Sequence, residues 1–252
     1  MKTNKITAIL LGFILLTACS KDDPAPAPVV VIPPVTDVLT TTNVKTYMVD
    51  PNATAETVAL FYNLKKLSKT KFAIGQQDAF NSFYNNGSSA QSDIKKTTGY
   101  DPALLGSDLM FITDKNNNGQ ASNWFYQQEV IITDDVKEAY SKGMINIFSW
   151  HLREPNKEDS FYANDMTDAV KTTAFKSILP GGANHAWYKT KLDKVASVVS
   201  NLKGSNGELI PIIFRPFYEF DGSWFWWGAN FCTAEEYKTA FQFTVDYLKN
   251  TK

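Results

Sequence analysis

Hydrophobic positions along this chain follow two alternating patterns from about residue 54 onward. Helical segments place apolar residues three and four positions apart, as with Leu60, Leu64 and Leu67, whereas short apolar runs such as 144–150 are typical of buried strands. The helical pattern predicts helices over residues 54–68, 89–98, 135–142, 185–203 and 233–252. Asp134 or Asp135 is expected to cap the third of these, and Thr233 with Glu236 forms a capping box for the last. The apolar runs predict strands over residues 71–77, 103–110, 144–150 and 209–214.

Four alternations of strand and helix predict a parallel sheet, because a helix carries the chain back to start the next parallel strand. Two folds meet this description, an open doubly wound sheet and a (β/α)8 TIM barrel. No glycine-rich dinucleotide or phosphate loop follows any predicted strand, which disfavours the open sheet. The predicted fold class is therefore α/β, a (β/α)8 TIM barrel of which this sequence holds about the first four strand-helix units.

The first 43 residues differ in character from the rest. Lys2 and Lys5 precede an apolar run over residues 6–16, which is shorter than the roughly 20 residues of a membrane helix and so predicts a signal peptide. The run ends in Leu-Thr-Ala-Cys, which resembles the bacterial lipobox, where the cysteine (here Cys19) becomes the lipidated first residue. We therefore expect a signal peptide over 1–18, a lipidated Cys19 with a Pro-rich linker over 19–43, and a folded domain over 44–252.

Lipidation at Cys19 has consequences for location and for the cysteines. The Ser-Lys-Asp-Asp that follows is similar to the export signal of Bacteroidetes-type lipoproteins, which predicts an outer-membrane protein, lipid-anchored and facing the cell surface. Cys232 would then have no partner for an intrachain disulfide, and two cysteines are too few for a zinc framework. A net charge of −1 without any basic block argues against nucleic acid as a partner.

Residues 114–119 (Asp-Lys-Asn-Asn-Asn-Gly) match the first half of a calcium-binding loop. The acidic residue that such a loop needs at its twelfth position falls on Phe125. The segment is therefore interpreted as a polar turn, and the sequence predicts no metal site.

The segment with the most chemical information is residues 212–228, IIFRPFYEFDGSWFWWG. Here a buried strand is followed by Tyr218 and Glu219, at the end where parallel barrels build their active sites. Trp224, Trp226 and Trp227 come next. An exposed aromatic run beside a carboxylate suits a sugar, whose C–H faces stack on aromatic rings while an acid acts on the glycosidic oxygen. The alternative is a core strand with an Arg–Glu ion pair and inward-facing tryptophans.

Arginine and histidine are rare in this chain, and their positions favour the interpretation of this segment as a sugar-binding site. The chain has two arginines, Arg153 and Arg215, and both follow predicted strand ends. Of its two histidines, His151 directly follows the third predicted strand. A histidine at such a place is often structural, but a barrel would bring it to the same rim as Glu219.

The whole segment around Glu219 resembles the acid/base segment of glycoside hydrolase family 26, and Gly75-Gln76-Gln77, Gly106-Ser107-Asp108 and Trp150-His151 with Glu154-Pro155 resemble earlier strand ends of that family. The resemblance covers about residues 44–252. It implies a (β/α)8 barrel and a retaining hydrolase of β-linked glycans, most often an endo-β-1,4-mannanase, that needs no metal or organic cofactor. It also implies that Glu219 is the general acid/base, that Arg215 orients carboxylates, and that His151 and Trp224 line the sugar subsites.

Two departures from the family pattern accompany this resemblance. Tyr218 occupies the position where the family usually has histidine, and a tyrosine can form hydrogen bonds there but carries no positive charge near neutrality. The family's nucleophile is a glutamate on the seventh strand, so we expect it beyond residue 252. The resemblance leaves two other functions open, a hydrolase of another β-glycan and a non-catalytic glycan-binding lipoprotein in which Trp224, Trp226 and Trp227 hold the sugar.

Overall fold

A computed structural model describes residues 38–81 and 91–251 of the 252-residue chain. The predicted signal peptide, Cys19 and most of the predicted linker lie outside the described residues. The chain divides into two units, Met1–Val38 and Leu39–Lys252, and the second holds all the elements below. Among the described residues, no helix combines the length and the apolar character needed to cross a bilayer.

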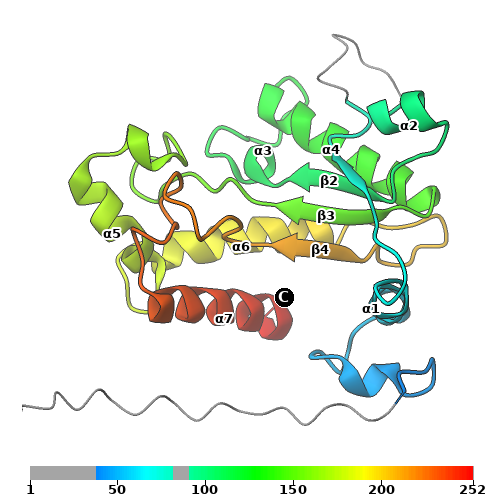
Figure 1. Cartoon of the computed structure of the whole chain (residues 1–252). Helices are drawn as coiled ribbons and strands as arrows, with labels where there is room; N and C mark the ends of the chain where they lie inside the picture. The colour runs from blue at the N-terminus through cyan, green and yellow to red at the C-terminus, as the bar shows by residue number, and fades with distance from the viewer. Residues whose placement is uncertain (1–37, 82–90, 252) are drawn as a thin grey trace, which may run out of the picture. The chain divides into compact units, whose positions relative to one another are not determined.

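Four parallel strands form the sheet (Figure 1). They are β1 (Gly75–Gln77), β2 (Leu104–Asp108), β3 (Ile145–Ser149) and β4 (Ile212–Arg215). Their order in the sheet is β1-β2-β3-β4, with Asp108 opposite Ser149 and Ser149 opposite Arg215. The carboxyl ends of the strands therefore meet at one edge, which we call the rim.

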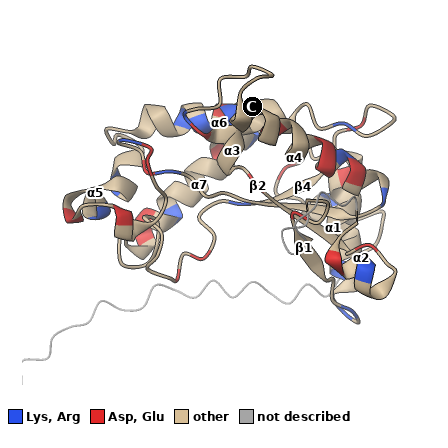
Figure 2. Cartoon of the chain, turned by 90° about the horizontal axis from the view of Figure 1, so that it is seen from above, with Lys and Arg blue, Asp and Glu red and all other residues tan. Residues whose placement is uncertain are grey.

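Helices connect the strands, as the alternating pattern predicted, and α4 packs along β2 and β3 (Figure 1). The α-helices are α1 (Ala55–Leu67), α2 (Asp93–Thr98), α3 (Met110–Thr113), α4 (Trp124–Ser141), α5 (Asp168–Ile178), α6 (His185–Val199) and α7 (Ala234–Thr251). Two short 3-10 helices, η1 (Val44–Tyr47) and η2 (Ala163–Asp165), complete the described elements. In the view of Figure 2, Lys and Arg alternate with Asp and Glu over these helices.

Side-chain caps decide where several helices begin. The Thr54 hydroxyl accepts a hydrogen bond from the Thr57 amide (3.2 Å) at the start of α1. At α7 the predicted capping box is confirmed, since the Glu236 amide donates to Thr233 Oγ1 (3.2 Å) and the Thr233 amide donates to Glu236 Oε2 (2.8 Å).

The predicted start of the helix before β3 is wrong. Asp134 or Asp135 was expected to cap it, but α4 begins at Trp124, where the Asn123 side chain accepts from the Tyr126 amide (3.0 Å). Asp134 and Asp135 lie inside α4 instead. The Asn123 cap therefore extends the helix at its amino-terminal end by residues 124–134.

The core lies between the sheet and the helices and is rich in aromatic rings. Its largest fully buried side chains include Trp150, Trp226, Trp227, Tyr188 and Phe148. Trp150 stacks on Tyr188 with ring centroids 6.0 Å apart, and its indole N–H donates to Thr113 Oγ1 (2.8 Å), so the polar group of this buried ring is satisfied. Gly106 in β2 lies close to β1, since an added Cβ would be 3.2 Å from Gln77 Cα and 2.4 Å from Gln77 Oε1, which would have to move.

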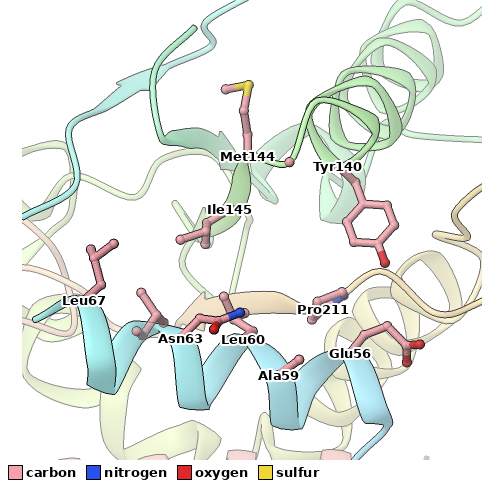
Figure 3. A pocket seen from close by; sticks show the side chains of 11 residues that line it. Glu56, Ala59, Leu60, Asn63, Leu67, Tyr140, Met144, Ile145 and Pro211 are labelled. Carbon is pink, nitrogen blue, oxygen red and sulfur yellow. The ribbon is translucent and has the colours of Figure 1, made fainter.

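A pocket of about 370 Å³ lies at the amino-terminal ends of β3 and β4. Figure 3 shows side chains of α1, such as Leu60 and Leu67, on one side of it, with Tyr140, Met144 and Ile145 on the other. Its wall is mainly apolar. Since it opens at the opposite end of the strands from Glu219, we assign no catalytic role to it.

Candidate active site

The rim gathers polar side chains that come from three strand ends. Asp108 is the last residue of β2, His151 follows β3 by two residues, and Arg215 is the last residue of β4. The register of the sheet sets Asp108, Ser149 and Arg215 in one row. Tyr218 and Glu219 follow in the turn after β4. All four predicted rim residues, His151, Arg215, Tyr218 and Glu219, thus lie at the same edge of the sheet.

Asp108 and His151 form the best-defined contact at the rim. Asp108 Oδ1 accepts from two backbone amides, that of Met110 (2.8 Å) and that of His151 (3.1 Å). Asp108 Oδ2 lies 2.7 Å from His151 Nδ1. Both side chains are largely buried, with 15% of Asp108 and 27% of His151 exposed. The carboxylate is therefore fixed by the ends of two strands before it meets the imidazole.

Tyr218 places its hydroxyl against the same imidazole. The hydroxyl contacts both His151 nitrogens, lying 3.0 Å from Nδ1 and closer to Nε2. Burial raises the pKa of the Tyr218 hydroxyl well above its ordinary value, and the charges of Asp108 and Glu219 raise it further. The guanidinium of Arg215, 5.5 Å from the Tyr218 ring centroid, opposes this effect. Tyr218 is thus held as a neutral hydroxyl.

Glu219 lies beside Tyr218 and is exposed to solvent. The indole N–H of Trp224 donates to Glu219 Oε2 (2.9 Å). Phe217 and Glu219 both have left-handed backbones, with φ of 53° and 54°, which non-glycine residues seldom adopt. This tight turn lets the partly buried Tyr218 meet His151 while the Glu219 carboxylate faces the solvent.

The predicted exposed aromatic run is wrong for two of its three tryptophans. Trp226 and Trp227 are fully buried, whereas Trp224 is 47% exposed. The Trp226 N–H donates to the Leu152 carbonyl and the Trp227 N–H to the Tyr218 carbonyl, each at 2.8 Å. Burial of these rings is favourable because both indole donors find backbone acceptors. Trp224 remains as the tryptophan of this group that can stack on a ligand.

A second segment, residues 161–163, also lies at the rim and was not predicted from the sequence. The Ala163 amide donates to the Trp224 carbonyl (2.7 Å), and Tyr162 forms an antiparallel bridge with Phe225. This pairing sets the Phe161 ring 4.6 Å from the His151 ring and leaves Tyr162 48% exposed. The only sequence signal was the pair of adjacent aromatic residues in an otherwise polar stretch.

Arg153 serves a structural contact. Its Nε lies 2.5 Å from Asp114 Oδ2, and the Asp114 side chain is fully buried. Asp114 Oδ1 also accepts from the backbone and side-chain nitrogens of Asn116, each at 2.9 Å. The segment that begins at Asp114 is a turn, as interpreted from the sequence. Arg153 and Asp114 tie this turn to the segment after β3.

Two further carboxyl groups have raised pKa values, Asp78 directly after β1 and Asp135 in α4. Burial and the charge of Asp108 raise the pKa of Asp78 to about 6. Burial and the charge of Glu138 raise the pKa of Asp135 to about 7, against a hydrogen bond from the Asn81 side chain. Among the described residues, no three His, Cys, Asp or Glu side chains gather closely enough to hold a metal ion.

Replacing Asp135 by asparagine should raise stability at alkaline pH. The unfolded carboxyl has an ordinary pKa of 3.8, so between that value and about 7 the folded chain binds a proton that the unfolded chain lacks. The free energy of unfolding therefore falls as pH rises through this window. Urea unfolding should be measured at about pH 4.5 and about pH 8. The free energy of unfolding of Asp135→Asn, relative to that of the unsubstituted chain, should be larger at the higher pH. Asp134→Asn, at the exposed neighbouring position, should show no such gain; equal behaviour of the two variants would contradict the assignment.

Chemically, the rim offers a solvent-facing carboxyl group, an exposed indole that contacts it and a row of hydrogen-bonding groups behind it. A carboxylic acid placed in this way can protonate a departing oxygen and later accept a proton from water. An indole face binds the apolar C–H side of a sugar ring. The arrangement suits acid/base chemistry on a glycan.

Comparison with known proteins agrees with this chemistry. Residues 49–252 match the model of glycosyl hydrolase family 26. A mannan endo-1,4-beta-mannosidase of Bifidobacterium adolescentis is 39% identical over 213 residues, which are 81% of this chain and 20% of that protein. The structure of a GH26 protein from a Muricauda species has 59% identity and a TM-score of 0.82, covering 84% of this chain and 57% of that one.

A modular endo-beta-1,4-mannanase from Cellulomonas fimi has 33% identity and a TM-score of 0.70, covering 80% of this chain and 44% of that one. This chain thus spans about half the length of these structural relatives. Its parallel strand-helix units are part of the (β/α)8 barrel of those proteins, as predicted. The chain belongs to glycosyl hydrolase family 26.

Proposed function

We propose that this chain carries the acid/base part of a retaining endo-β-1,4-mannanase. The observation that carries the proposal is the position of Glu219, on the rim and exposed, with its carboxylate bonded to the exposed Trp224. Relatives named for mannan endo-1,4-beta-mannosidase activity support β-mannan, galactomannan or glucomannan as the substrate.

In this mechanism Glu219 protonates the glycosidic oxygen as the bond to the sugar breaks, and then removes a proton from the incoming water. A retaining hydrolase also needs a carboxylate nucleophile about 5–5.5 Å from the acid. We assign that nucleophile to residues outside the 252 of this sequence. The Trp224 N–H holds Glu219 Oε2, which leaves Oε1 available to the substrate.

The remaining rim residues bind the sugar in this proposal. His151 and Tyr218 present polar groups behind Glu219, and Trp224 offers a stacking face beside it. Arg215 would orient carboxylates through its exposed guanidinium, which in this structure lies over the Tyr218 ring. None of these roles needs a metal or an organic cofactor.

The test is the release of reducing ends by a polypeptide that contains this chain and the rest of the family domain. Galactomannan and glucomannan should be cleaved, whereas xylan and mixed-linkage β-glucan serve as controls. Cleavage of a control glycan in place of mannan would show a related hydrolase of another β-glycan. Binding of mannan without any cleavage would show a glycan-binding protein and would refute the catalytic proposal.

We further propose that the mature protein is anchored in the outer membrane through lipid on Cys19 and faces the cell surface. The support is the sequence of the first 23 residues. Cells that express the chain and are fed labelled palmitate should incorporate the label into it, and Cys19→Ser should remove the label. Incorporation that persists in Cys19→Ser would refute the anchor. Digestion of the protein by a protease added to intact cells tests the surface location.

A further inference from the structure

Asp108 is a carboxylate at the rim, in contact with His151, to which the proposed mechanism gives no role. Its Oδ1 is occupied by two backbone N–H donors, from Met110 and His151. The carboxylate can therefore neither rotate nor withdraw without leaving two amides unsatisfied. Only Oδ2 remains for the imidazole, 2.7 Å away.

This geometry fixes which nitrogen of His151 carries the proton. An ionised carboxylate can only accept hydrogen bonds, so Nδ1 must be the donor in this contact. In the neutral imidazole Nε2 is then the acceptor. The Tyr218 hydroxyl lies closest to Nε2, and a hydroxyl can donate there. The hydrogen bonds accordingly run in one direction, from Tyr218 to His151 and from His151 to Asp108.

We propose that Asp108 is a positioning residue, which sets the tautomer of His151 and through it the direction of the Tyr218 hydroxyl. Because the Tyr218 hydroxyl donates its hydrogen bond to His151, it can only accept hydrogen bonds from a molecule bound at the rim. A sugar hydroxyl that meets Tyr218 must then be a donor. This inference rests on the proposed function for its meaning in catalysis, since it describes how the residue next to Glu219 receives substrate.

The Tyr218 hydroxyl also lies 3.0 Å from Nδ1, farther than Asp108 Oδ2, and the imidazole has no other side-chain hydrogen-bond partner among the described residues. Its remaining neighbours are aromatic rings, those of Phe161 at 4.6 Å and Phe225 at 5.3 Å between centroids. Charged groups near Tyr218 are Glu219 and Arg215, and Arg215 contacts the Tyr218 ring face and not the imidazole.

Nitrogen-15 NMR of the imidazoles in this 252-residue chain tests the proposal. The chain has two histidines, and His185→Gln assigns their signals. At a pH about two units above the ordinary histidine pKa of roughly 6.5, His151 should show a protonated Nδ1 and an unprotonated Nε2. His185 is an internal reference, because its Nδ1 lies 2.8 Å from the Ile178 carbonyl and must donate to it.

Asp108→Asn should reverse the His151 tautomer. The asparagine oxygen would keep the two backbone donors, so the amide NH₂ would face Nδ1 and make it an acceptor. The signal of protonated Nδ1 should be lost and that of protonated Nε2 should appear. Asp159→Asn, a matched change at an exposed ion pair with Lys115, should leave both histidines unchanged. Tyr218→Phe should keep protonated Nδ1, because Asp108 alone imposes it.

A protonated Nε2 in the unsubstituted chain, or a protonated Nδ1 that survives in Asp108→Asn, would overturn the proposal. An unchanged His185 signal shows that a variant is folded. If Asp108→Asn fails this check, the spectra of the unsubstituted chain and of Tyr218→Phe still decide the question. The measurement involves no hydrolysis, so its outcome is separate from that of the reducing-end assay.

Discussion

Replacing Glu219 by alanine is expected to lower the turnover of β-1,4-mannan at least about 100-fold, in a polypeptide that contains the complete family domain. The change removes the group proposed to protonate the departing oxygen, while Trp224, Tyr218 and His151 remain to bind sugar. Affinity for mannan should therefore stay close to that of the unsubstituted protein. Initial rates of reducing-end release and affinity electrophoresis on galactomannan measure the two effects separately.

Two companion variants make the Glu219 test specific. Glu219→Gln keeps an oxygen that can accept from the Trp224 indole, so the side chain stays in place but cannot transfer a proton. It should lose turnover as Glu219→Ala does. Glu235→Ala, at an exposed position in the first turn of α7, should keep full turnover. Near-normal rates in Glu219→Gln would show that the acid lies elsewhere.

Replacing Arg153 by alanine is expected to destabilise the chain by about 3–5 kcal/mol. The Asp114 carboxylate is fully buried and bonded to Arg153 Nε, so the substitution leaves a buried charge without its partner. The two hydrogen bonds from Asn116 that remain cannot neutralise that charge. Urea unfolding of the 252-residue chain, followed by tryptophan fluorescence, measures the difference in the free energy of unfolding.

The neighbouring ion pair supplies the control. Lys115 lies 2.8 Å from Asp159, and both side chains are well exposed. Lys115→Ala should destabilise the chain far less than Arg153→Ala, since water solvates the carboxylate that is left behind. Similar losses for Arg153→Ala and Lys115→Ala would contradict the view that burial makes the first pair important.

Sequence patterns located the strands better than they located the ends of the helices. Each predicted strand overlaps an observed one, because short apolar runs next to turn residues are a local signal. β1 is shorter than predicted, three residues in place of seven, and Phe72 and Ile74 before it are exposed. α5 was missed because its sequence carries two adjacent threonines and its buried face has only Ala174, Phe175 and Ile178.

The candidate site could likewise be predicted only in part. His151, Arg215, Tyr218 and Glu219 could be placed on one rim because each follows a strand, and parallel strands end at one edge. Burial of Trp226 and Trp227 could not be predicted, since their indole donors are satisfied by carbonyls that the local pattern does not identify as partners. The contact of Asp108 with His151 joins residues 43 positions apart, and only the register of β2 and β3 brings them together.

The order of the strands in the sheet also bears on how the protein is made. Each of β2, β3 and β4 pairs with the strand that precedes it in the chain. Its partner is therefore already synthesised when it leaves the ribosome or the translocation channel. No strand has to be inserted between two that already pair. Such a sheet can grow stepwise from its amino-terminal side during synthesis, and β4 brings Glu219 to a rim on which Asp108 and His151 are already in contact.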